Sequence, residues 1–225
     1  VHSVDDEILK SDFVQLLLKN KTMLCPTLIV HGGYIKTFGQ NINPSNYELL
    51  KADPYQLGSL LDLKHLPDTL RINMYKERAN SLQSIASLKT ADSICMANLK
   101  ILSDAGVLIA TGTDAGNIGT MHASSYLNEL QAMQQSGMNS WQLLIASTLN
   151  GAKVLGKQNE LGSVNIGKKA NLVLLDANPI NNIENVTKIN RIINKGVVFN
   201  PDELLKDTPE DLAQVQGRLK HISID

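Results

Sequence analysis

A continuous apolar run that ends in a glycine and a carboxylate constrains this chain more than any other segment. Residues 107–113 read Val-Leu-Ile-Ala-Thr-Gly-Thr, Asp114 follows directly, and Gly116 comes soon after it. A run without polar alternation is typical of a strand buried on both faces, as the strands of parallel sheets are. Ligands of α/β folds collect at the carboxyl ends of such strands. The pattern therefore predicts a parallel α/β fold with Asp114 at the edge where chemistry takes place.

Asp114 nevertheless has two interpretations on spacing alone. A short carboxylate after a strand often caps the next helix or accepts backbone N–H groups. The flanking Gly112 and Gly116 favour a functional role, because a glycine lets the backbone and a ligand approach each other closely.

Composition excludes several classes of partner. The hydrophobic fraction of 43% and the charged fraction of 19% are globular values, and a net charge of -1 predicts no attraction to nucleic acid or anionic lipid. No apolar window reaches the roughly 18 residues that a membrane-spanning segment needs. Cys25 and Cys95 lie in apolar segments and are expected to be buried thiols without a disulfide. Because the sequence starts at Val1 rather than at a methionine, we expect an amino-terminal part to be missing, and the localisation is unreadable.

Apolar runs and amphipathic stretches alternate along residues 1–157, which is the pattern of a parallel α/β fold. Between residues 31 and about 67 the sequence is irregular and rich in Asn, Pro and Gly, as functional lids often are. We therefore expect an inserted loop and helical region over 31–90. The expected strands are 22–30 and 107–113, and the expected helices are 5–19, 68–105 with a joint near Lys89-Thr90, 121–135 and 140–155.

The character of the sequence changes near residue 160. Glycines punctuate short apolar pieces there, a strand is expected over 170–176, and two strands around an Asn-Lys-Gly turn are expected over 191–199. These features predict a separate small β domain over 158–200, followed by a helical polar tail over 201–225.

Histidines supply the other candidate site residues. His2 is expected at the end of an apolar strand, so that it would share one rim of the sheet with Asp114, where a metal or an acid–base pair could form. His31 and His122 follow segments that lead to the same rim, although loop and helix-start histidines are more often structural. The sequence lacks the dinucleotide fingerprint, the P-loop and the nucleophile elbow of serine hydrolases.

Four segments together resemble the carboxyl-terminal half of a metal-dependent amidohydrolase, of the imidazolonepropionase and prolidase-like branch. The order and spacing of these segments make the resemblance specific, and it covers most of residues 1–200. Thr148-Leu-Asn-Gly-Ala152 is also similar to the helix before the family's small domain. The four segments are His2-Ser-Val, Cys25-Pro-Thr-Leu28, Gly112-Thr-Asp114 and the glycine-punctuated stretch Leu161–Pro179.

The resemblance implies the last strands and helices of a TIM (β/α)8 barrel, joined to part of a small β-sandwich domain. It implies that Asp114 binds metal and takes a proton from the attacking water, and that His2 is a second metal ligand. One or two divalent ions, most often Zn²⁺, are implied as cofactor, and a small molecule with a C–N bond is implied as substrate. From their positions, His31, Tyr34, Asn117 and His122 are candidates for substrate contact.

The family's remaining metal ligands have no counterpart in this sequence. We therefore expect the missing amino-terminal half of the barrel to be a partner, whereas homo-oligomerisation stays open. The alternative is a non-catalytic assembly or binding module that keeps the fold without a complete metal site.

Overall fold

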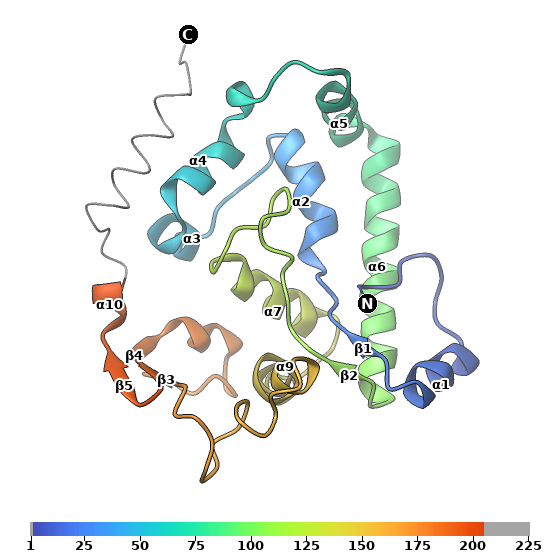
Figure 1. Cartoon of the computed structure of the whole chain (residues 1–225). Helices are drawn as coiled ribbons and strands as arrows, with labels where there is room; N and C mark the ends of the chain where they lie inside the picture. The colour runs from blue at the N-terminus through green and yellow to red at the C-terminus, as the bar shows by residue number, and fades with distance from the viewer. Residues whose placement is uncertain (1, 205–225) are drawn as a thin grey trace.

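The α/β part of the molecule contains two short parallel strands, which lie near its lower end in Figure 1. The structure, a computed structural model, describes residues 2–204. In it β1 (Met23–Leu24) pairs with β2 (Leu108–Ile109), and the amide of Ala110 extends the pairing by donating to the carbonyl of Leu24 at 2.9 Å. The described residues therefore contain a parallel pair and not a closed barrel.

Both strands are shorter than the apolar runs that predicted them. The expected strand over 22–30 is wrong beyond Leu24, because α2 (Ile29–Phe38) begins inside the run and continues through the glycines that were expected to break it. Each strand has one neighbour among the described residues, and a strand is only as long as the ladder it can form.

Helices account for most of the α/β part, and those from α2 to α6 connect β1 to β2. The expected joint near Lys89 is wrong, because the two helices meet at Ser81, whose hydroxyl caps the second one. The helices are α1 (Ser11–Lys19), α3 (Asn46–Lys51), α4 (Pro54–Leu61), the 3-10 turn η1 (Leu63–His65), α5 (Leu70–Asn80), α6 (Leu82–Asp104), α7 (Ser125–Gln135), α8 (Ser140–Ile145), the π-helical η2 (Ala146–Asn150) and α9 (Gly151–Val154).

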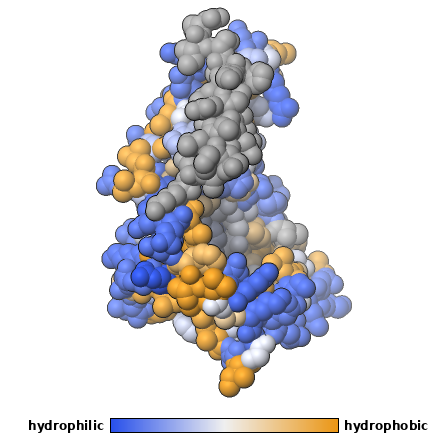
Figure 2. Space-filling view, turned by 60° about the vertical axis from the view of Figure 1, so that its left-hand side comes forward, coloured by the Kyte–Doolittle hydropathy of each residue, from blue (hydrophilic) through white to orange (hydrophobic). Residues whose placement is uncertain are grey.

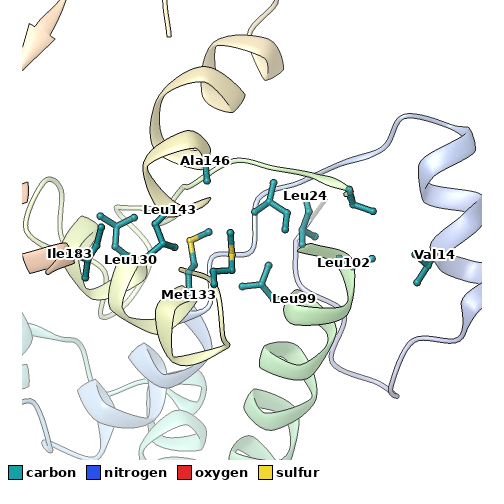
Figure 3. Packing of buried hydrophobic residues seen from close by; sticks show 12 residues of the cluster. Val14, Leu24, Leu99, Leu102, Leu130, Met133, Leu143, Ala146 and Ile183 are labelled. Carbon is teal, nitrogen blue, oxygen red and sulfur yellow. The ribbon is translucent and has the colours of Figure 1, made fainter. Parts of the chain in front are cut away.

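The core lies where α6, α7 and α8 pack against the two strands. Figure 3 shows its side chains in a continuous band that runs from Ile183 at one end to Val14 at the other. Leu99, Met133 and Leu143 are at most 1% exposed. Because α6, α7 and α8 each contribute apolar side chains to the same band, this core holds them beside the strands. A second cluster packs Phe38 and Tyr34 of α2 against Ala79 and Tyr75 of α5.

A separate antiparallel sheet follows the α/β part. Its strands are β3 (Leu172–Leu175), β4 (Ile189–Asn194) and β5 (Val197–Phe199), in that order. The hairpin turn at Lys195 and Gly196 has positive φ at both positions, as the expected Asn-Lys-Gly turn requires, and this prediction is confirmed. The 3-10 turn η3 (Ile183–Thr187) lies between β3 and β4, and α10 (Pro201–Leu204) follows β5.

Two further expectations can be compared with the described residues. The tail predicted over 201–225 begins with α10, and positions 205–225 lie outside the described residues. Within residues 2–204, no helix combines the length and the apolar character needed to cross a bilayer.

Candidate functional site

The carboxyl edge of the parallel pair is the place where the predicted metal ligands were expected to meet. Residues 2–10 form neither the end of a strand nor the first turns of a helix, so the predicted helix over 5–19 begins only at Ser11. His2 reaches the edge in another way. Its Nδ1 lies 2.9 Å from the hydroxyl of Thr27, which follows β1.

A buried amide holds the irregular segment in place. Asn98 of α6 is 1% exposed, and its side-chain amide donates to the carbonyls of Val4 and Glu7 and accepts from the amide of Leu9. Residues 4–9 thus satisfy backbone groups against a side chain instead of forming a helical turn, since buried backbone groups need partners. Nearer the edge, the Ser3 hydroxyl donates to the carbonyl of Pro26 at 2.6 Å.

A buried carboxylate fixes the other side of the edge. Glu129 of α7 is 0% exposed, and its two oxygens accept from the amides of Leu28 and Ile29 at 3.0 and 3.1 Å. These amides belong to the amino-terminal end of α2, where free N–H groups and the helix dipole favour negative charge. Burial nevertheless dominates and raises the pKa of Glu129 from 4.5 to about 7, against the opposing effect of the N–H donors.

Asp114 lies in a tight loop that follows β2. Its φ of 51° is in the left-handed region, which costs an L residue energy and is frequent at functional positions. The loop is closed by hydrogen bonds from the amide of Asn117 and the hydroxyl of Thr120 to the Asp114 carbonyl. Asp114 is not the N-cap residue of α7, because Ser124 occupies that position. Its carboxylate is exposed and accepts one hydrogen bond, from the Asn117 side-chain amide at 3.2 Å.

Tyr34 and Asn117 orient this carboxylate. The Tyr34 hydroxyl on α2 donates to the side-chain oxygen of Asn117 at 2.8 Å. The same oxygen also accepts from the backbone amide of Ile118 at 2.8 Å. Because that oxygen is occupied twice, the amide nitrogen of Asn117 faces Asp114. Tyr34 is itself held by Tyr75, with ring centroids 5.6 Å apart.

Close backbone contacts hold the loop against α2 and β1. A Cβ on Gly33 would lie 2.4 Å from the carbonyl oxygen of Ile118, and one on Gly119 would lie 2.4 Å from the Gly33 Cα. A Cβ on Gly112 would likewise lie 2.4 Å from the sulfur of Cys25. These three glycines let the loop and the strands approach more closely than side chains would permit.

The structure brings Tyr34, Asn117 and His122 to the Asp114 loop, whereas His2 contacts Thr27 and His31 lies elsewhere. The His122 ring lies beside the Asp114 loop, because a Cβ on Gly116 would be 3.5 Å from its Cε1. His31 faces α6 instead, with its Nδ1 3.7 Å from a carboxylate oxygen of Asp92. Asp92 and the Cys95 thiol raise the pKa of His31 from 6.5 to about 10. The predicted contact of His31 with substrate stays a prediction, and none of these contacts supports it.

Thr27 and Glu129 were missed by the sequence analysis. Glu129 could have been noticed, because it shares the apolar face of its helix with Leu130 and Met133, where a charged residue is unusual. Thr27 gives no such signal, since nothing local indicates its φ of 49°.

The donor types at this edge suit a zinc ion, but the described residues do not complete a zinc site. His2 offers an imidazole nitrogen and Asp114 offers carboxylate oxygens, which are common zinc ligands. A catalytic zinc site usually takes three ligands from the protein. Between residues 2 and 204, no group of three or more His, Cys, Asp or Glu side chains is arranged to hold a metal.

Comparisons with known proteins place this arrangement in a family. A 5'-deoxyadenosine deaminase from Methanobrevibacter smithii is 30% identical over 103 residues, covering 43% of this chain and 23% of the relative. An imidazolonepropionase from Shouchella clausii is 32% identical over 114 residues, covering 46% of this chain and 25% of the relative. The chain therefore spans about a quarter of the length of these curated relatives.

A solved structure and a family model extend the likeness over more of the chain. The structure of a Xaa-Pro dipeptidase with bound methionine is similar in fold, with a TM-score of 0.55 and 20% identity, and covers 85% of this chain and 38% of that one. The model of the amidohydrolase family matches residues 29–199, which include β2, the Asp114 loop and the small sheet. The chain belongs to the amidohydrolase family.

Proposed function

We propose that this chain forms part of the active site of a metal-dependent hydrolase that cleaves a C–N bond in a cyclic amide, a dipeptide or a related small molecule. The observation that carries the proposal is the Asp114 loop. An exposed carboxylate lies there in left-handed backbone at the carboxyl edge of a parallel strand pair, oriented by Asn117 and Tyr34. Fixed, strained and accessible carboxylates of this kind are expected at reacting centres and not in a core.

Asp114 is the proton carrier of the proposed reaction. Its free carboxylate oxygen takes a proton from the attacking water and later delivers it to the leaving nitrogen. The imidazole of His2, oriented by Thr27, offers its Nε2 as a metal ligand together with Asp114. A bound zinc ion would lower the pKa of a water toward about 7 and polarise the substrate carbonyl.

Tyr34, Asn117 and His122 line the approach to Asp114 and are proposed to contact the substrate. Tyr34 and Asn117 do so from a fixed hydrogen-bonded pair, and His122 from the end of the same loop. Rigid groups that touch the substrate hold it in one orientation, which lowers the entropic part of the barrier.

The remaining ligands are proposed to come from polypeptide that this sequence does not include. Residues 1–157 would supply the last strands and helices of a (β/α)8 barrel, and residues 158–200 would supply part of a small β domain. The partial coverage of the similar proteins supports the proposal that further polypeptide supplies the missing ligands. So does the β3–β5 sheet, whose outer strands are each paired on one side among the described residues and whose apolar residues remain exposed.

A second candidate function is a non-catalytic assembly module of the same fold. The observation that favours it is the lack of a three-ligand cluster among the described residues. Metal content separates the two functions. The catalytic proposal expects zinc to be bound stoichiometrically only when the chain is joined to the rest of the barrel, whereas an assembly module binds no zinc in either form.

The decisive experiment is Asp114→Asn in the protein that includes the polypeptide upstream of Val1, loaded with zinc. Hydrolysis of an Xaa-Pro dipeptide and of a cyclic amide should fall at least about 100-fold in kcat, because a general base typically contributes that much or more. Asp176→Asn is the matched control, since Asp176 is an exposed carboxylate of the small β unit that accepts from Asn190 at 2.7 Å. Turnover within a few-fold of the unsubstituted protein in the Asp114 variant would contradict the proposal.

A further inference from the structure

Thr27 joins the metal-ligand candidate His2 to the fully buried Glu129. Its hydroxyl is 2.9 Å from Nδ1 of His2, and the two residues after it donate their amides to Glu129. Thr27 is 7% exposed and has a φ of 49°, a left-handed conformation that a β-branched residue rarely adopts. Such a conformation costs of order 1–3 kcal/mol and persists only when its surroundings over-determine it.

Glu129 supplies that constraint. With both oxygens on the amides of Leu28 and Ile29, it fixes the direction in which the chain leaves Thr27 and enters α2. The Ser3 hydroxyl holds the preceding residue by donating to the Pro26 carbonyl. Thr27 is therefore held on both sides in a conformation that aims its hydroxyl at His2.

We infer that Glu129 is a positioning residue, which sets the tautomer and orientation of His2 through Thr27. In this arrangement the Nδ1–H of His2 donates to the Thr27 hydroxyl, and the lone pair of Nε2 remains available for a metal. A metal-ligating histidine usually has its second nitrogen fixed by such a partner. The role of His2 as a metal ligand rests on the proposed function. The effect of Glu129 on the His2 imidazole does not, because it can be measured in the chain without metal.

The opposing interpretation is that Glu129 only stabilises the end of α2. A carboxylate at a helix amino terminus does this in many proteins, and it would affect stability without affecting His2. The two interpretations differ in the imidazole of His2, because a neutral imidazole without a partner favours the Nε2–H form in water. The tautomer is therefore the measurement that separates positioning from capping.

The experiment records side-chain ¹⁵N NMR of the metal-free chain at pH 8, with four variants. The unsubstituted chain should show His2 with the proton on Nδ1. Glu129→Gln and Thr27→Val should move it to the Nε2–H form, the first by releasing Thr27 and the second by removing the hydroxyl. Thr27→Ser keeps the hydroxyl and should retain the Nδ1–H form. Glu48→Gln is the control for a buried carboxylate, since Glu48 is 8% exposed and lies on α3.

Several outcomes would overturn the inference. One is a Nε2–H tautomer in the unsubstituted chain, and another is an unchanged Nδ1–H signal in Glu129→Gln while Thr27→Val loses it. If the amide spectrum shows that Glu129→Gln does not fold, Glu129→Asp takes its place. Its shorter arm cannot reach both amides, so the same shift of tautomer is expected, and retention of the Nδ1–H form overturns the inference.

Titration with ZnCl₂ of the longer protein, which includes the polypeptide upstream of Val1, distinguishes this inference from the proposed function. If His2 binds metal, zinc should perturb its Nε2 there, and Glu129→Gln should weaken that binding about tenfold or more, as loss of a group that orients a metal ligand does. If zinc leaves Nε2 unperturbed while the tautomers behave as expected, the role of Glu129 stands and the metal role of His2 fails.

Discussion

The α/β part and the β3–β5 sheet contain similar apolar residues but differ in where those residues lie. In the α/β part, Leu143 and Met133 are 0% exposed, because helices and strands form two layers around them. In the sheet, Val173 is 56% and Val198 is 60% exposed. Figure 2 shows apolar groups gathered on the lower half of this face, the part of the molecule that carries the sheet in Figure 1.

The two regions also differ in the kind of contact that determines their structure. The sheet is specified locally, by β-branched residues and a turn with positive φ, and it forms without a second layer. The α/β part is specified by contacts between distant residues, such as those of Asn98 with residues 4–9 and of Glu129 with α2. Substitutions should therefore be costly in the core of the α/β part and inexpensive in the sheet.

The largest expected effect is that of Leu143→Ala, which leaves a cavity between α8 and α7. Removing a fully buried leucine side chain should lower the free energy of unfolding by about 3 kcal/mol. Urea unfolding followed by circular dichroism measures the change. Leu174→Ala in the sheet, where the side chain is 43% exposed, is the control and should cost less than half as much. Equal losses would show that the sheet also belongs to a core.

The second effect is a pH dependence that arises from Glu129. Because its pKa is raised in the folded protein from 4.5 to about 7, the folded state binds more protons between these values, and stability falls as pH rises from about 4.5 to 7. The contribution amounts to about 3 kcal/mol for a fully buried group. Urea unfolding at several pH values should show this slope in the unsubstituted chain and in Glu48→Gln, but not in Glu129→Gln. An unchanged slope in Glu129→Gln would contradict the assignment.

The contrast between local and distant contacts also explains which parts of the fold could be predicted. The hairpin around Lys195 and the helices from Ser140 to Val154 follow from turn residues and capping groups near them in the sequence. The amino terminus of α2 could not be predicted in this way, because its cap is Glu129, about 100 positions away along the chain. The apolar run before it therefore indicated a strand.

The candidate site follows the same rule. Asp114 could be located from the sequence because the strand, the glycines and the carboxylate are adjacent. The partner of His2 could not, since Thr27 adopts its left-handed conformation only under constraint from α7. His31 was expected at the rim from its position after an apolar run, and the helix that replaces the strand turns it toward Asp92 instead.

A third prediction concerns the backbone contact that holds the Asp114 loop. Gly33→Ala would place a Cβ 2.4 Å from the Ile118 carbonyl oxygen, so the loop or α2 must shift, at a cost of about 2 kcal/mol. Gly32→Ala is the matched control. Its Cβ meets only a Lys36 carbon at 3.8 Å, and alanine is the better helix former, so stability should rise by up to about 1 kcal/mol. Thermal unfolding of both variants measures the difference, and a loss in both would point to helix geometry rather than to the loop.

The smallest expected effect is that of Val198→Thr on the exposed sheet. Threonine keeps the β-branched shape, and Val198 pairs with Ile193 through the backbone, so the free energy of unfolding should change by less than about 0.5 kcal/mol. Ile183→Thr is the comparison, because Ile183 is 1% exposed and buries its side chain in the core, where an added hydroxyl should cost about 2 kcal/mol. The longer protein, with polypeptide upstream of Val1, tests whether another segment covers the sheet. If it does, Val198→Thr should lower the free energy of unfolding there by an amount closer to that expected for Ile183→Thr. A cost that stays small there would mean that the sheet remains open to solvent.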